Sequence, residues 1–161
     1  MSSIHLVRLC DPEYANTPEE MLNGEGAFLH GGRWNSPGHR VVYLSESLSL
    51  AAFEILVHAR SKQLLNQYRY IQVDVPEELV MVLDDAVLPD DWDEPFNYAL
   101  QEIGDEWMRS GQSLGLSLPS AAIPGERNVV LLPDHPDFKK ILVHAEIQSF
   151  SFDQRLQGKL K

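Results

Sequence analysis

The chain has 161 residues, of which 43% are apolar and 23% charged, a composition usual for one globular domain with its own core. It contains no apolar stretch near the roughly 18 residues of a membrane helix and no start typical of a signal peptide. Its single cysteine, Cys10, excludes an internal disulfide. We therefore expect a cytoplasmic protein without membrane association. The net charge of −11 argues against direct nucleic-acid binding, which needs a cationic surface, but is compatible with a basic protein partner or with an anionic small molecule in a locally cationic pocket.

Hydrophobic periodicity predicts short strands and helices without a regular strand–helix–strand repeat. Strands are predicted at 4–9, 40–44, 70–75, 115–123 and 129–132, with further strand over 141–147 and 150–152. Helices are predicted at 18–22, from a cap at Ser45 or Ser47 to about Arg60, and at 96–109. This order indicates an α+β domain and argues against a Rossmann fold.

Residues 11–39 are expected to be mostly loop, and this loop contains a positioned arginine. Arg33 lies in the run GGRWN, directly before Trp34. An arginine beside glycines can present its guanidinium group to phosphate oxygens while backbone N–H groups assist. The alternative is an ordinary loop arginine next to a tryptophan packed in the core. Five of the ten glycines lie in the loop and indicate a shaped backbone: Gly24, Gly26, Gly31, Gly32 and Gly38.

Glu54 lies within SLSLAAFEILVHAR, a helix that is apolar on almost every side and is therefore expected to be mostly buried. No lysine or arginine lies three or four residues away, and position i+4 is His58. A buried carboxylate without a partner is costly and is often functional. The alternative places Glu54 on a narrow solvated stripe with Ser47, His58 and Ser61.

Ser120 is the third candidate; it lies in LPSAAIPGERN, within the strand predicted at 115–123. It is not a nucleophile elbow, because the GxSxG pattern is absent, but it can donate and accept hydrogen bonds. The alternative is an ordinary serine at a strand end. The six histidines show no metal-binding spacing, so we expect no metal site. Cys10 is expected in the core, and the acidic loop 84–94 at the solvated surface.

Together these segments resemble the RES family, which is named for an arginine, a glutamate and a serine. GGRWNSPGHRVVYLSESLSLAAFEILVH (31–58) is similar to the family signature, and PGERNVVLLPDHPDF (124–138) matches the family pattern of Glu-Asn followed by His-Pro. The resemblance covers 4–152 and leaves 153–161 as a C-terminal tail. By motif, the family residues correspond to Arg33, Glu54 and Ser120, with Ser117 as the alternative serine, and Tyr43 matches a tyrosine of the family pocket.

The resemblance implies an ADP-ribosyltransferase-like fold and a toxin of a type II toxin–antitoxin pair with an Xre-type helix-turn-helix antitoxin. It implies NAD as substrate, no cofactor, and cleavage of the nicotinamide–ribose bond by water, or by phosphate in some members. Nicotinamide leaves as a neutral molecule, so the reaction needs no general acid and one carboxylate suffices for catalysis. Glu54 would stabilise the cationic ribose and Arg33 would bind the pyrophosphate. Tyr43 would stack on nicotinamide, and Ser120 would hydrogen-bond a ribose hydroxyl or the carboxamide.

Other functions stay open at this point. The same residues would serve transfer of ADP-ribose to a protein, and a chain that had lost catalysis would act as a partner-binding module. A metal-free nuclease is disfavoured by the negative charge. The sequence fixes neither the acceptor nor the oligomeric state, a homodimer included.

Overall fold

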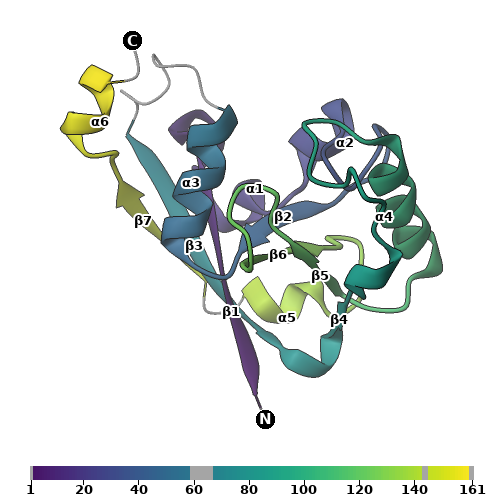
Figure 1. Ribbon diagram of the computed structural model, residues 1–161. Coiled ribbons are helices and arrows are strands. Elements are labelled where there is room, and N and C mark those ends of the chain that lie inside the picture. The colour runs from purple at the N-terminus through teal and green to yellow at the C-terminus, as the bar shows by residue number, and fades with distance from the viewer. Residues whose placement is uncertain (1, 59–66, 143–144, 160–161) are drawn as a thin grey trace.

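The structure is a computed structural model that describes residues 2–58, 67–142 and 145–159 of the chain (Figure 1). Within these residues seven strands form one sheet in the order β4-β5-β6-β2-β1-β3-β7. Neighbouring strands are antiparallel, except that β4 runs parallel to β5. The strands are β1 (Ser3–Cys10), β2 (Val42–Ser45), β3 (Tyr68–Pro76), β4 (Val80–Val82), β5 (Gly115–Pro119), β6 (Arg127–Leu131) and β7 (Glu146–Phe150).

Two longer helices and several short ones flank this sheet (Figure 1). None of the helices in the described ranges has the length and apolar character needed to cross a membrane. The α-helices are α1 (Pro18–Met21), α2 (Glu25–His30), α3 (Leu48–His58), α4 (Tyr98–Ser110), α5 (Phe138–Leu142) and α6 (Gln154–Lys159), and the 3₁₀ turns are η1 (Pro12–Tyr14), η3 (Glu77–Leu79) and η4 (Asp85–Val87).

Strand alternation divides the core between the two faces of the sheet. In β6, Val129 and Leu131 belong to the cluster that includes α5, whereas Val130 points the other way and packs with α4. On this second face α3 covers β1, where Ala51 packs in one cluster with Val7. In Figure 1, α3 and α4 lie well apart. The pocket described below is lined by residues of α3 and of the loop 31–34.

The starts of both long helices follow from their capping residues. Ser47 accepts a hydrogen bond from the backbone N–H of Leu50 at 3.1 Å, so Ser47 caps α3, while Ser45 lies in β2. Asn97 accepts one from the N–H of Ala99 at 2.9 Å and caps α4, which begins two residues later than predicted. The predicted end of α3, at Arg60, lies outside the described residues.

The predicted α+β class, with short strands and flanking helices, is confirmed. The prediction of strand over 141–147 is wrong at its start. Residues 141–142 end α5, which buries Phe138 and Ile141 at helical spacing, and residues 143–144 lie outside the described part of the chain. The remainder belongs to β7, which ends at Phe150. Phe152 lies beyond that strand and packs edge-to-face on Tyr68.

The strand predicted over 115–123 is shorter than expected, because β5 ends at Pro119, which has no N–H to donate to a sheet. The residues that follow form the turn that contains Ser120. Helix α2, strand β4 and helix α6 were not predicted, and α6 lies within the segment interpreted as a tail.

Candidate active site

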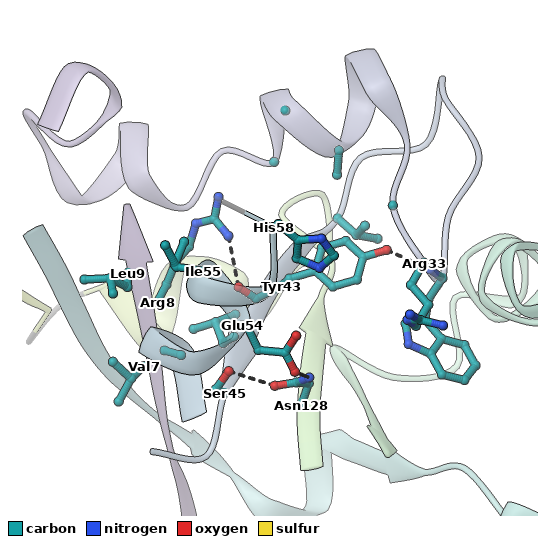
Figure 2. Close-up of a pocket in the computed structure, with 18 of the residues that line it drawn as sticks. Val7, Arg8, Leu9, Arg33, Tyr43, Ser45, Glu54, Ile55, His58 and Asn128 are labelled. Carbon is teal, nitrogen blue, oxygen red and sulfur yellow. Dashed lines mark hydrogen bonds between the residues drawn. The ribbon is translucent and has the colours of Figure 1, made fainter. Parts of the chain in front are cut away.

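A pocket of about 540 Å³ opens on the face of the sheet between α3 and the glycine-rich loop (Figure 2). Its volume lies within the range of roughly 300–1,000 Å³ that is usual for small-molecule sites. Its walls come from β1, β2, β6, α2, α3 and the loop after α2. The polar side chains that line it include Arg8, Arg33, Tyr43, Ser45, Glu54, His58 and Asn128.

Glu54 projects from α3 toward β6, and its carboxylate is held at one oxygen (Figure 2). Oε1 accepts hydrogen bonds from Oγ of Ser120 at 2.7 Å and from Nδ2 of Asn128 at 2.8 Å. No hydrogen bond from the described residues reaches Oε2. Glu54 is partly buried and lines the pocket. The solvated-stripe alternative therefore does not describe its position, and Oε2 is available to a ligand.

The two groups that hold Glu54 are themselves fixed. Oδ1 of Asn128 accepts a hydrogen bond from Oγ of Ser45 at 2.7 Å, and these two residues are paired in the register of β6 and β2. Oγ of Ser120 accepts from the backbone N–H groups of Ala122 and Ile123, at 3.1 Å each. The Ser120 hydroxyl hydrogen is thus directed at Glu54, which stabilises the charged carboxylate.

Ser120 lies behind Glu54 and is only 3% exposed. The family resemblance implies a hydrogen bond from Ser120 to substrate; in the structure, its hydroxyl donates to the Glu54 carboxylate. The alternative, Ser117, lies elsewhere: its Oγ accepts a hydrogen bond from Nε of Arg127 at 2.8 Å. Ser120 is therefore the serine that meets the glutamate.

Arg33 lines the pocket and, in Figure 2, lies on the opposite side of Glu54 from Arg8. Its Nη1 donates to the backbone carbonyls of Trp92 at 3.1 Å and Glu94 at 2.8 Å. Both carbonyls belong to the acidic loop, which is thereby bound to the pocket wall. Nε and Nη2 make no hydrogen bond with the described residues and can receive an anion.

The ring of Tyr43 lines the pocket, while its hydroxyl is committed to the Arg33 loop. The hydroxyl donates to Oδ1 of Asn35 at 2.6 Å and accepts from the N–H of Trp34 at 3.0 Å. Burial raises the pKa of Tyr43 well above its ordinary value, so the hydroxyl stays protonated. A Cβ at Gly32 would lie 2.7 Å from this oxygen, so the close approach requires glycine.

Arg8 is a second pocket cation, which the sequence reasoning missed. From β1, its Nε donates to the carbonyl of Met21 at 2.8 Å and its Nη1 to that of Tyr43 at 3.0 Å. The available signal was a charged residue inside the apolar run LVRLC. Asn128 was also missed as a site residue, although it lies in the quoted GERN segment.

The pocket thus places the Glu54 carboxylate, held at one oxygen, between Arg8 and Arg33, and Asp11 also lines it. Such a site suits an anionic ligand in which positive charge develops beside Glu54. Within the described ranges, no three His, Cys, Asp or Glu side chains lie close enough to hold one metal ion.

The sheet and the pocket define an α+β domain with a candidate small-molecule site. The chain belongs to the RES domain family, whose model matches residues 5–153, and the predicted family is confirmed.

Several relatives are similar over most of their length. "Toxin Res" of Photorhabdus laumondii subsp. laumondii is 40% identical over 152 residues, which cover 94% of this chain and 96% of the relative. "Prs ADP-ribosylating toxin" of Sphingobium sp. (strain YBL2) is 36% identical, with 84% and 86% covered. The crystal structure of the M. tuberculosis MbcT–MbcA toxin–antitoxin complex contains a chain with the same fold, at a TM-score of 0.68 and 21% identity, covering 98% of this chain and 88% of that one.

Proposed function

We propose that this toxin cleaves the nicotinamide–ribose bond of NAD and so depletes it. The observation that carries the proposal is the Glu54 carboxylate, held at Oε1 by Ser120 and Asn128 while Oε2 faces a pocket with two arginines. When the bond breaks, its electron pair leaves with nicotinamide, which becomes neutral, and positive charge develops on the ribose. A fixed carboxylate beside that charge lowers the barrier without a general acid.

The other pocket residues bind and orient the dinucleotide. Arg33 retains Nε and Nη2 for pyrophosphate oxygens, and Arg8 adds a second positive charge across the pocket. The ring of Tyr43 offers a flat face for nicotinamide, because its hydroxyl is turned into the Arg33 loop. We assign Ser120 to positioning Glu54, since it lies behind the carboxylate.

Purified toxin, freed of any antitoxin, tests the proposal. Incubation with NAD and a chelator should release nicotinamide, with Glu54→Gln as the inactive control. In the presence of inorganic phosphate, the second product identifies the acceptor: free ADP-ribose for water, or its phosphate ester for phosphate. NAD that stays intact with folded, monodisperse wild-type protein would refute the proposal.

A second candidate is transfer of ADP-ribose to a protein, and the name of the Sphingobium relative favours it. The same carboxylate and arginines would serve, with a protein side chain in place of water or phosphate. The two candidates differ in a single measurement. Release of nicotinamide from NAD alone supports depletion, whereas release only on addition of an acceptor protein, with label retained on that protein, supports transfer.

The partner proposed for this toxin is an antitoxin of the Xre helix-turn-helix type, and the toxin–antitoxin complex formed by its structural neighbour supports an antitoxin in general. The unused donors of Arg33 suit an anionic group, such as an acidic side chain or a terminal carboxylate of the antitoxin. Co-purified complex should therefore cleave NAD slowly, and C-terminal truncation of the antitoxin should restore cleavage. A complex as active as free toxin would contradict this mode of inhibition.

A further inference from the structure

One face of helix α4 packs directly on the turn that carries Arg33. Gln101, Gly104 and Asp105 form this face at the i, i+3 and i+4 spacing of one helix side. The turn itself is closed by a bridge between Gly32 and Asn35, in which the N–H of Gly32 donates to the carbonyl of Asn35 at 2.9 Å. None of the three α4 residues lines the pocket.

Gln101 spans the turn on both sides of Arg33. Its Nε2 donates to the carbonyl of Gly32 at 3.0 Å and to that of Asn35 at 3.1 Å. Both hydrogens of the amide group are therefore used to hold Gly32 and Asn35, which flank Arg33 and Trp34 in the turn. These bonds set the direction in which the Arg33 side chain leaves the backbone.

Asp105 holds the far end of the same turn. Its carboxylate accepts hydrogen bonds from the backbone N–H and the Oγ of Ser36, and Nε2 of His39 lies 3.9 Å away. Asp105 is 8% exposed, so these bonds form in a largely dry environment. Gly104, between the two clamping residues, brings the helix backbone into close contact with the carbonyl of Trp34.

We propose that Gln101 and Asp105 are positioning residues, which aim Arg33 at the bound dinucleotide from outside the pocket. This inference rests on the proposed NAD site. Helix α4 is anchored to the sheet separately, by the buried side chains of Leu100 and Trp107. The two bonds of Gln101 therefore contribute to the orientation of the turn more than to the attachment of the helix.

The test measures NAD affinity by calorimetry in a Glu54→Gln background, where bound NAD should be turned over about 10²–10³-fold more slowly. Gln101→Met keeps the length of the side chain and removes both donors. We expect it to weaken binding about tenfold, the effect of losing one to two hydrogen bonds. In an Arg33→Lys background the same substitution should have little further effect, because the two residues act through one contact.

Gln112→Met is the matched control, since Gln112 is exposed and lies just beyond α4. Its NAD affinity and its melting temperature should both equal those of the parent. Ser36→Ala is a second variant, which removes one bond to Asp105 without altering α4 and should weaken binding about threefold.

Unchanged affinity in Gln101→Met, or losses that simply add to those of Arg33→Lys, would overturn the positioning role alone. If wild-type toxin leaves NAD intact and the Glu54→Gln background binds none, the proposed function fails first, and this inference fails with it. The two failures are therefore distinguishable by the behaviour of the parent proteins.

Discussion

The two ends of the pocket are held by different kinds of contact. Glu54 is fixed by side chains on strands or directly after one: Asn128 and Ser45 are paired in β6 and β2, and Ser120 follows β5. Arg33 is fixed by backbone carbonyls of the acidic loop, while its own turn is clamped by α4.

This difference separates two functions. The position of Glu54 depends on sheet register, which a single loop substitution does not shift. The position of Arg33 depends on how its own turn packs against the acidic loop and α4, and a single substitution at these contacts can alter that packing. We therefore expect defects at the Glu54 end to appear in kcat and defects at the Arg33 end to appear in KM.

The largest effect is expected at Glu54. Glu54→Gln retains the volume of the side chain and an oxygen that accepts from Ser120 and Asn128, but it removes the charge. We expect kcat to fall by about 10²–10³-fold, with KM and melting temperature nearly unchanged. Steady-state assays of nicotinamide release measure this, and near-normal turnover would show that the charge is not used in the reaction.

The position of Arg33 can be disturbed through α4, which packs on the turn that carries it. A Cβ added by Gly104→Ala would overlap the carbonyl oxygen of Trp34, so α4 or the turn must shift. Such overpacking costs roughly 1–3 kcal/mol of unfolding free energy, and the variant that remains folded should show a raised KM. Gly26→Ala is the control for stability in denaturant melts, because nothing lies within 4 Å of the added Cβ. Equal stability of both variants would contradict the tight contact.

A smaller change sharpens the comparison at Arg33 itself. Lysine keeps the positive charge but cannot present paired N–H donors, or bond both loop carbonyls in the same way. We expect Arg33→Lys to lower kcat/KM about tenfold, mainly through KM. Arg155→Lys serves as control, since Arg155 lies exposed on α6. A loss confined to kcat would mean that the arginine acts on the transition state.

Local alternation and helical spacing were enough to predict most of the elements. The strands at 4–9, 70–75 and 129–132 and the helix at 96–109 each present a clear periodic pattern. The apolar run around Ile141 is compatible with the spacing of a strand and with that of a helix. The segment is helical in the structure, where Ile141 packs in the core cluster on one face of the sheet. Strand β4 has three residues and is defined by its parallel pairing with β5, which lies more than thirty residues away and leaves no local signal.

The site shows the same division. Arg33, Tyr43, Glu54 and Ser120 were found through the family motifs, and the structure brings Glu54 and Ser120 together across 66 positions of sequence. Arg8 and Gln101 were missed because they act through backbone carbonyls. A carbonyl is present at every residue, so the sequence does not indicate which one a side chain will meet.

The smallest effect concerns the Tyr43 hydroxyl, which hydrogen-bonds to the turn that carries Arg33. Because burial raises its pKa, folded protein keeps this proton at pH values where an unfolded tyrosine, with a pKa of about 10, releases it. Above that pH the unfolded state binds fewer protons than the folded state, so stability falls as pH rises.

The expected loss from Tyr43 is roughly 0.4 kcal/mol at pH 10 and grows at higher pH. Denaturant melts across about pH 8 to 11 should therefore show a steeper decline for wild type than for Tyr43→Phe, which has no proton to release there. Tyr43→Phe is also less stable at neutral pH, because Oδ1 of Asn35 and the N–H of Trp34 lose their partner. The difference between the two proteins should accordingly narrow as pH rises, and parallel curves would show that the hydroxyl is as open to water as in the unfolded chain.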